Sequence, residues 1–336
     1  MPRVLLTHSP DALANYYGDE ALAGLCALAE VRLNPLGRDM DVDEMIDAAR
    51  DCELIVSYRK SEAPARVFSS LPSLVAFSRC AIDIRNIDVD AASANGVLVT
   101  QAGPGFVASV AEWTIGAMVD LSRGLGRASA EYHAGRVPAA TMGRELYGAT
   151  LGVIGYGRIA RYLCRVALAF GMRVVVADPY ARVPGTRIRR LGLDEVLAEA
   201  DYLVCLAVAT EETENLMDAA AFARMKPGAY FVNPSRGNLV DEAALCAALD
   251  SGRLAGCALD VGRAPDQMPT PALAAHPRVI ATPHVGGLTP PAINRQAMDT
   301  VAQVAAILKG DVPKGAVNAA RASRFAAMRA RAASDA

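Results

Sequence analysis

A glycine-rich turn between two predicted elements restricts the fold of this 336-residue chain more than any other feature. Thr150–Ile154 is an apolar, β-rich run, and Gly155-x-Gly157-x-x-Ala160 follows it at the start of a helical pattern. The first glycine permits a tight turn, the second lets a pyrophosphate approach the backbone, and the alanine allows close helix–strand packing. Free N–H groups at such a helix start bind phosphate. The segment therefore predicts a dinucleotide-binding site.

Asp178 sharpens this prediction because it ends the next apolar run, Arg173–Ala177, about 20 residues after the glycines. A carboxylate at this position accepts hydrogen bonds from both ribose hydroxyls of NAD and repels the 2′-phosphate of NADP. Arg182 lies nearby and leaves some use of NADP open. We predict NAD as the cofactor.

Short apolar runs alternate with helical patterns along the rest of the chain, which is typical of parallel α/β sheets. The predicted strands are 4–7, 53–57, 74–78 and 96–100 before the glycine turn, and 202–208, 228–232, 255–261 and 278–281 after it. Gly124–Gly148 is rich in glycine and predicts a connection or an arm, and Pro290–Lys309 predicts a long helix. For the Ala/Arg-rich tail, Ala319–Ala336, we expect a frayed or surface helix.

Composition narrows the class of protein. With 52% hydrophobic residues the chain can bury a large core, and a net charge of −2 gives no general attraction to nucleic acid or to an anionic membrane. No apolar stretch approaches the roughly 20 residues of a membrane span. The seven cysteines are scattered and form no C-x-x-C pair, so we expect no metal site and a reducing, cytoplasmic setting.

Several further motifs occur in a fixed order: Ser109–Glu112, Leu151–Ile159, Met225–Gly237, Leu239–Glu242 and Thr282–Gly287. In these motifs the chain resembles the D-isomer-specific 2-hydroxyacid dehydrogenases. The resemblance implies an α/β fold with two Rossmann-like doubly wound domains. It implies an NAD-binding domain at 103–286, inserted into a flavodoxin-like substrate domain made of 1–102 and 287–336. It also implies a homodimer.

The resemblance assigns roles to matched positions. Arg236 would bind the carboxylate of a small 2-oxo acid, because a guanidinium matches a carboxylate in shape and charge. His284 would exchange a proton with the substrate oxygen. Arg158 would either contact the pyrophosphate or be only a solvated residue of the first helical turn, and Ile159 beside it is assigned to the cofactor site. Asp260 would either contact the nicotinamide side or only cap the end of its strand.

Two positions depart from the family pattern. The glutamate that usually assists the catalytic histidine is replaced by Pro265, and Asp266 is the nearest carboxylate, so we predict Asp266 as the partner of His284. The alternative is that Asp266 is a surface acid of the loop and that His284 works with less assistance. In the substrate loop, Ala81 and Asp83 flank Ile82 where relatives carry Gly-x-Gly. Asp83 would repel a carboxylate if it faced the pocket. We expect it to point away, or to select a substrate with a hydroxyl or an amine.

The function predicted is hydride transfer between NAD(H) and a small D-2-hydroxy or 2-oxo acid. A glyoxylate or hydroxypyruvate reductase and a short phosphoglycerate dehydrogenase remain open within this class. The short stretch after residue 310 weighs against a longer, serine-regulated phosphoglycerate dehydrogenase. Two further alternatives are an NAD-sensing, corepressor-like binding protein and a catalytically silent homologue.

Overall fold

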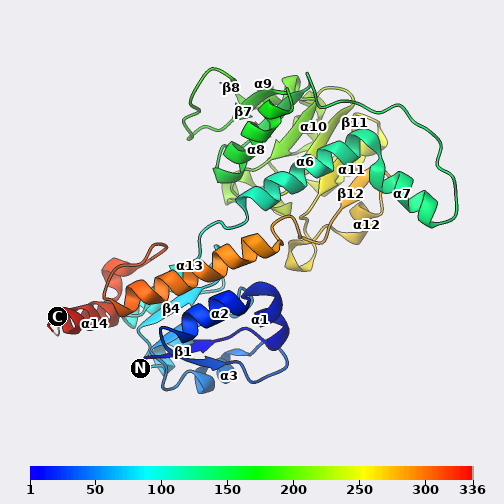
Figure 1. Ribbon diagram of the computed structural model, residues 1–336. Helices are drawn as coiled ribbons and strands as arrows, with labels where there is room; N and C mark the ends of the chain where they lie inside the picture. The colour runs from blue at the N-terminus through cyan, green and yellow to red at the C-terminus, as the bar shows by residue number, and fades with distance from the viewer. Residues whose placement is uncertain (335–336) are drawn as a thin grey trace. The chain divides into compact units, whose positions relative to one another are not determined.

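The computed structural model describes residues 1–334, and the chain divides into two compact units. Unit 1 consists of residues 1–106 together with 289–336, and unit 2 consists of residues 107–288 (Figure 1). The limits predicted from the sequence lie at 102/103 and 286/287. Each unit carries its own parallel sheet, and the two are described in turn.

Unit 1 contains a five-stranded parallel sheet in the order β2-β1-β3-β4-β5, which is the flavodoxin-like order. Its strands are β1 (Arg3–Leu6), β2 (Glu30–Leu33), β3 (Leu54–Ser57), β4 (Ala76–Arg79) and β5 (Leu98–Gln101). Its helices are α1 (Pro10–Tyr16), α2 (Asp19–Cys26), α3 (Val42–Ala48), α4 (Ala65–Ser70), α5 (Val89–Ala94), α13 (Pro290–Leu308) and α14 (Ser323–Ser334), with the short 3₁₀ helix η4 (Ala319–Arg321).

The long helix α13 belongs to unit 1 although it follows unit 2 in the chain. Thr289 caps it by accepting a hydrogen bond from the Ala292 N–H, and Pro290 occupies its first turn. Ala297, Val304 and Ile307 are fully buried and recur at helical spacing. This apolar face packs against α2 and β4, which is why the chain returns to the first sheet.

The C-terminal tail forms the helix α14, and most of its described side chains are exposed, as expected for a surface helix, but its start is anchored in unit 1. Phe325 is 1% exposed and joins the core of unit 1. The Arg324 N–H donates to the Gly96 carbonyl oxygen at 2.9 Å, and its guanidinium donates to the Leu71 carbonyl oxygen at 2.7 Å. Residues 335–336 lie outside the described part of the chain.

Unit 2 contains a seven-stranded parallel sheet in the order β12-β11-β10-β9-β6-β7-β8. Numbered from β6, this is the Rossmann order with one additional strand. Its strands are β6 (Thr150–Ile154), β7 (Arg173–Ala177), β8 (Ile188–Arg190), β9 (Tyr202–Cys205), β10 (Ala229–Asn233), β11 (Leu254–Leu259) and β12 (Val279–Ala281). Its helices are α6 (Val107–Arg123), α7 (Leu125–His133), α8 (Arg158–Ala169), α9 (Leu193–Glu199), α10 (Ala219–Arg224), α11 (Glu242–Asp250) and α12 (Pro271–Ala274), with η1 (Glu211–Thr213), η2 (Gly237–Leu239) and η3 (Pro265–Gln267).

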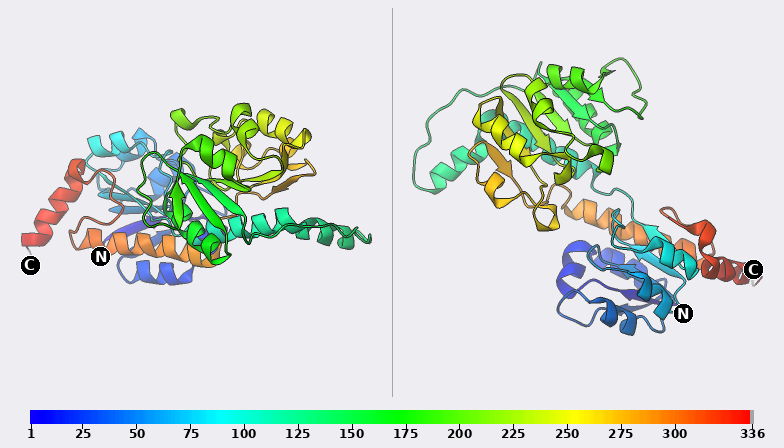
Figure 2. Two further views of the ribbon diagram at one scale, coloured as in Figure 1. Left: turned by 90° about the horizontal axis from the view of Figure 1, so that it is seen from above. Right: turned by 180° about the vertical axis from the view of Figure 1, so that it is seen from behind.

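The segment predicted as a connection or an arm contains a helix that the glycines concealed. The helix α7 occupies its first third, and α7 with the chain after it extends away from the sheet of unit 2 (Figures 1 and 2). Tyr132, Val137 and Met142 are more than half exposed in this segment. Large apolar side chains so exposed are typical of a surface that binds another protein.

The fold prediction is confirmed, since both sheets are parallel and doubly wound. No helix within residues 1–334 is long and apolar enough to cross a membrane. The edge strands β2 and β8 are not among the strands predicted from the sequence. Both are short and carry charged side chains, which protects sheet edges from pairing with other chains but hides the strand pattern.

Candidate active site

The glycine turn follows β6, the strand between β7 and β9. Gly155 has a φ of +88°, and a Cβ atom on it would lie 2.6 Å from the Leu206 carbonyl oxygen. Its N–H donates to the Ala177 carbonyl oxygen at 2.8 Å and ties the turn to the end of β7. Only glycine accommodates this backbone conformation together with this close approach.

Gly157 precedes α8 and borders open space. A Cβ atom on Gly157 would meet no protein atom within 4 Å, and its φ of −76° is ordinary. Arg158 is exposed and Ile159 half-buried in the first helical turn, whereas Ala160 is fully buried. Free backbone N–H groups beside open space suit a phosphate. The residues present therefore fit the pyrophosphate of a dinucleotide.

Asp178 follows β7 with its carboxylate fixed by the backbone. Oδ2 accepts a hydrogen bond from the Tyr156 N–H at 2.7 Å, and Oδ1 accepts from the N–H groups of Tyr180 and Ala181, both at 2.8 Å. Burial disfavours the charged carboxylate, but these hydrogen bonds outweigh it and lower the pKa of Asp178. The result is an oriented anion near the glycine turn. Arg182, the residue that left NADP open, is exposed.

Arg236 follows β10 in a loop organised by Asn233, which is 1% exposed. The Asn233 amide donates to the Arg236 carbonyl oxygen at 2.9 Å and accepts from the Ser235 N–H at 3.0 Å. The Arg236 guanidinium donates to the Ser235 carbonyl oxygen at 2.7 Å. A Cβ atom on Gly237 would lie 2.1 Å from Gly262, so the Arg236 loop lies directly against the loop after β11.

Asp260 lies directly after β11 and is 3% exposed. Its Oδ1 accepts hydrogen bonds from Thr282 Oγ1 at 2.6 Å and from the Val285 N–H at 2.8 Å. Its Oδ2 accepts from the Gly286 N–H at 2.7 Å. One buried carboxylate thus fixes both ends of the segment 282–286, and His284 lies within that segment. These contacts give Asp260 a role in the loop itself.

His284 has a φ of +56°, a conformation that few residues other than glycine adopt. Its N–H donates to the Thr282 carbonyl oxygen at 2.9 Å. Its ring atom Nδ1 lies 3.0 Å from the main-chain carbonyl oxygen of Asp266. The predicted neighbours His284 and Asp266 are therefore in contact, and the contact involves the backbone of Asp266.

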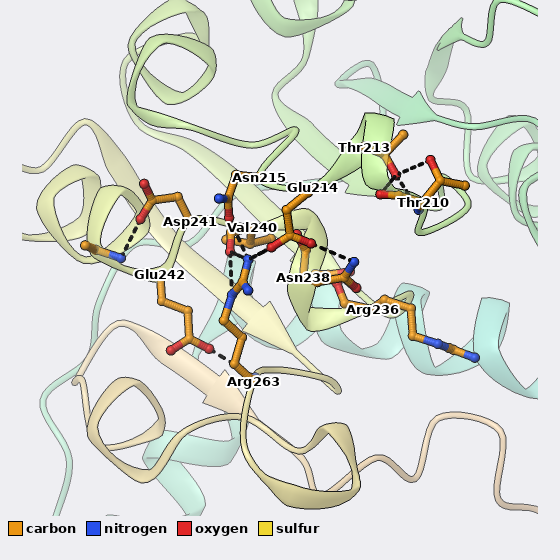
Figure 3. Close-up of polar contacts among 12 residues, drawn as sticks. Thr210, Thr213, Glu214, Asn215, Arg236, Asn238, Val240, Asp241, Glu242 and Arg263 are labelled. Carbon is orange, nitrogen blue, oxygen red and sulfur yellow. Dashed lines mark hydrogen bonds and ion pairs between the residues drawn. The ribbon is translucent and has the colours of Figure 1, made fainter. Parts of the chain in front are cut away.

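Arg263 anchors the loop that carries Asp266, and Figure 3 shows its guanidinium among the side chains of a polar cluster. It donates to Glu214 Oε1 at 2.8 Å and to Asn215 Oδ1 at 2.6 Å. The bond from Arg263 to Glu214, together with one from the Asn238 amide, lowers the pKa of Glu214. The Arg236 side chain extends away from this cluster (Figure 3).

Asn233 and Arg263 are not among the site residues predicted from the sequence. Asn233 stands three residues before Arg236 in the motif Asn-Pro-Ser-Arg-Gly, so a polar residue at a strand end was an available signal. Arg263 lies in the segment that departs from the family pattern, and its partners come from distant parts of the chain. No local pattern indicates such contacts.

The predicted substrate loop lies in unit 1, directly after β4. The Ala81 carbonyl oxygen accepts from the Ala102 N–H at 3.1 Å, and Ala81, Ile82 and Asp83 are all partly exposed. Asp83 accepts from Arg85 Nε at 2.9 Å through Oδ1 and at 3.0 Å through Oδ2. This ion pair partly neutralises the carboxylate that would oppose an anionic substrate.

Two buried polar side chains lie at the same edge of the unit 1 sheet. His8 is 2% exposed between the rings of Tyr17 and Tyr58, and neither of its ring nitrogens has a partner within residues 1–334. Burial, and then the charge of Arg79, lower the pKa of His8 to about 3. Arg79 is fully buried and donates to the carbonyl oxygens of Tyr58 and Ser61.

Among the described residues, no group of three or more His, Cys, Asp or Glu side chains is arranged to hold a metal ion. All seven cysteines are free. Burial raises the pKa of the Cys80, Cys164 and Cys205 thiols to about 12, so these three are small core residues rather than nucleophiles.

Comparison with known families identifies unit 2. The family described as "D-isomer specific 2-hydroxyacid dehydrogenase, NAD binding domain" matches residues 115–286. The chain belongs to this family. The matched residues include the glycine turn, Asp178, Arg236, Asp260 and His284. The match confirms NAD as the cofactor of this domain.

Relatives of known structure or name agree with this assignment. The chain is 35% identical to a D-3-phosphoglycerate dehydrogenase from Mycobacterium tuberculosis over 282 residues, covering 83% of this chain and 53% of that protein. It therefore spans about half the length of that relative. The crystal structure of the TT0316 protein from Thermus thermophilus has a TM-score of 0.82 at 30% identity, covering 94% of this chain and 99% of that one.

A third relative was solved with its ligands. The D-lactate dehydrogenase from Aquifex aeolicus, "complexed with NAD and Lactic acid", has a TM-score of 0.73 at 28% identity. The similarity covers 92% of this chain and 96% of that one. Similarity over nearly the whole length of both chains supports the two-domain architecture.

Proposed function

We propose that this protein is an NAD-dependent oxidoreductase that transfers a hydride between NAD(H) and a small D-2-hydroxy or 2-oxo acid. One observation carries the proposal. At the carboxyl edge of the unit 2 sheet, the buried carboxylate of Asp260 fixes the segment that contains His284, in the same domain as the glycine turn. Ligands of doubly wound sheets bind at this edge. An imidazole fixed there suits acid–base chemistry.

Each of these residues of unit 2 has a separate role in the proposed reaction. Arg236 binds the carboxylate and the 2-oxo group of the substrate and orients the carbonyl carbon. His284 donates a proton to the carbonyl oxygen during reduction and accepts it back during oxidation. Asp260 positions His284 by fixing the backbone around it. Asp266 is the hydrogen-bond partner of the His284 ring. NAD, when bound, supplies or takes the hydride at C2 of the substrate.

The glycine turn and Asp178 would bind the dinucleotide. Gly155 makes the turn, Gly157 leaves space for the pyrophosphate, and Arg158 and Ile159 begin the helix beside it. The oriented, anionic Asp178 would accept hydrogen bonds from the ribose hydroxyls and disfavour a 2′-phosphate. We therefore expect NADH to bind more tightly than NADPH, and the opposite order in a titration would contradict this assignment.

Unit 1 would serve as the substrate domain and unit 2 as the NAD-binding domain. The loop of Ala81, Ile82 and Asp83 follows a strand of the unit 1 sheet at its carboxyl edge, where a ligand is expected. Because the Asp83 carboxylate is paired with Arg85, it would oppose an anionic substrate only weakly. The named relatives act on small hydroxy acids, phosphoglycerate and lactate, and we propose a substrate of this class.

We further propose that the protein is a homodimer in the cytoplasm. The exposed apolar side chains of α7 and the chain after it, including Tyr132, Val137 and Met142, support an association of two copies through unit 2. The free cysteines, scattered without pairing, suit a reducing compartment.

NADH consumption with a panel of small 2-oxo acids tests the proposed function. The panel includes glyoxylate, pyruvate, hydroxypyruvate and its 3-phosphate. We expect turnover of at least one member, and in His284→Ala a fall in kcat of about 100-fold or more with NADH binding retained. His276→Ala is the matched control, because His276 lies in a loop of the same unit and pairs with Asp250. A protein that binds NADH but turns over no member would instead be a binding protein or a silent homologue.

A further inference from the structure

The contact between His284 and Asp266 carries a further inference, which rests on the proposed function for its catalytic meaning. The family pattern places a glutamate near the catalytic histidine, and Asp266 is the nearest carboxylate in this chain. The bond that the structure gives, however, runs from Nδ1 of the ring to the main-chain carbonyl oxygen of Asp266 at 3.0 Å. A carbonyl oxygen can only accept a hydrogen bond, so Nδ1 must carry the hydrogen.

This assignment fixes the chemistry of the other ring atom. With the hydrogen on Nδ1, the neutral ring presents a lone pair at Nε2, and the protonated ring presents an N–H there. Nε2 is then the atom that accepts a proton from the 2-hydroxyl group and returns it to the 2-oxo oxygen. The partner of Nδ1 decides the tautomer, as it does wherever histidine exchanges protons.

The local backbone explains why the carbonyl points at His284. Asp266 and Gln267 both have a φ of +57°, so two consecutive residues adopt the left-handed conformation. Hydrogen bonds from the Gly262 N–H to the Gln267 carbonyl oxygen, 2.8 Å, and from the Ala264 N–H to the Met268 carbonyl oxygen, 3.0 Å, close the loop around this turn.

The loop is also anchored from outside. Arg263 ties its start to Glu214 and Asn215, and a Cβ atom on Gly262 would lie 2.5 Å from the Pro269 Cα atom. The direction of the Asp266 carbonyl is therefore set by a turn that is held by hydrogen bonds and by a close backbone contact. Left-handed backbone outside glycine is costly and concentrates at functional sites.

We propose that Asp266 is a positioning residue that acts through its main-chain carbonyl, and that its left-handed conformation, rather than its charge, orients His284. Aspartate and asparagine tolerate this conformation because their short polar side chains bond locally, whereas a β-branched residue does not. The carboxylate of the family glutamate is thus replaced by a turn that delivers a backbone carbonyl to Nδ1.

A pair of substitutions separates conformation from charge. Asp266→Asn removes the charge and keeps a residue suited to the turn, so we expect kcat within about twofold of the parent value. Asp266→Val keeps the position but disfavours the turn, so we expect kcat to fall about tenfold or more, with the dissociation constant of NADH unchanged. Asp266→Gly, which also adopts the turn, should rescue most of the activity.

Heteronuclear NMR of the labelled imidazole nitrogens supplies a readout that needs no substrate. The chain has only four histidines, and comparison with His284→Gln assigns the signal. We expect the Nδ1–H tautomer of His284 in the parent protein and in Asp266→Asn, and a mixture in Asp266→Val.

Two results would overturn the proposal. One is an Nε2–H tautomer in the parent protein, and the other is a loss of kcat in Asp266→Asn as large as in Asp266→Val. Should Asp266→Val fail to fold, the tautomer of His284 in the parent protein and the kcat of Asp266→Asn still test the proposal. The NMR result also stands if no 2-oxo acid is turned over, so failure of the proposed function is distinguishable.

Discussion

Polar side chains at the carboxyl edges of the two sheets differ in how completely they are hydrogen-bonded. In unit 2, Asp178 and Asp260 each accept three hydrogen bonds from neighbouring groups of the same unit. In unit 1, His8 is buried with neither ring nitrogen partnered within residues 1–334, and Arg79 donates to neutral acceptors. The two strand-end carboxylates of unit 2 are therefore already oriented by the fold, whereas the imidazole of His8 in unit 1 makes no hydrogen bond within residues 1–334.

The difference has a consequence for function. A carboxylate that is fully bonded in the folded protein costs nothing further to orient when a cofactor or a substrate binds. A buried imidazole without partners instead weakens its own unit, most of all where the imidazole would take up a proton. The substitutions below test this contrast, from the largest expected effect to the smallest.

Asp260→Ala should have the largest effect, because it leaves three partly or fully buried donors without their acceptor and releases the segment that contains His284. We expect the free energy of unfolding to fall by about 3 kcal/mol and kcat to fall about 100-fold. Denaturant titration and steady-state kinetics measure the two effects. Asp250→Ala is the control, since Asp250 is exposed and should change neither quantity; an equal loss in both variants would contradict the anchoring role.

The glycine turn offers a matched pair with the next largest effect. Gly155→Ala forces a Cβ atom against the Leu206 carbonyl oxygen at positive φ, so we expect a stability loss of about 1–3 kcal/mol together with weaker NADH binding. Gly157→Ala meets no protein atom, so we expect a stability loss of about 1 kcal/mol at most, but NADH binding weakened about tenfold. Equal stability losses in the two variants would contradict the assignment of Gly155 to the turn and of Gly157 to the space for the phosphate.

Acid should act on unit 1 through His8. The folded pKa of His8 is lowered to about 3 from 6.5, so the unfolded chain binds more protons between these values and stability falls as the pH falls below 6.5. His8→Leu removes this dependence. Between pH 7 and pH 5 we expect the variant to lose about 2 kcal/mol less than the parent protein.

Urea titrations at both pH values measure this difference. His133→Gln is the control, because His133 is exposed and should keep the parent behaviour. An unchanged pH dependence in His8→Leu would mean that the buried imidazole is not the group that responds to acid.

Asp83→Ala should have the smallest effect on stability. Its carboxylate forms a half-exposed ion pair with Arg85, and such pairs contribute less than about 1 kcal/mol. If Asp83 points away from the substrate, KM for 2-oxo acids should change less than about threefold. A tenfold change in KM for one substrate alone would instead make Asp83 a selectivity residue, and the substrate panel distinguishes the two.

Much of the fold was predictable because its signals are local. The glycine turn, the alternation of strands and helices and the long helix α13 each depend on consecutive residues with a clear period. The charged edge strands β2 and β8 broke that period, and the glycines around α7 concealed a helix. The anchoring of the tail was not predictable, because burial of Phe325 depends on a surface formed by residues far from it in the chain.

The candidate site divides in the same way. The sequence by itself determined the family, the type of fold, and the positions of Gly155, Asp178, Arg236 and His284, because turn chemistry and motif spacing reside in contiguous residues. Only the tertiary structure decided that Asp260 fixes the segment around His284 and that the Asp266 contact is made by a backbone carbonyl. Those contacts join segments that follow different strands, and they depend on backbone conformations that residue identities alone do not specify.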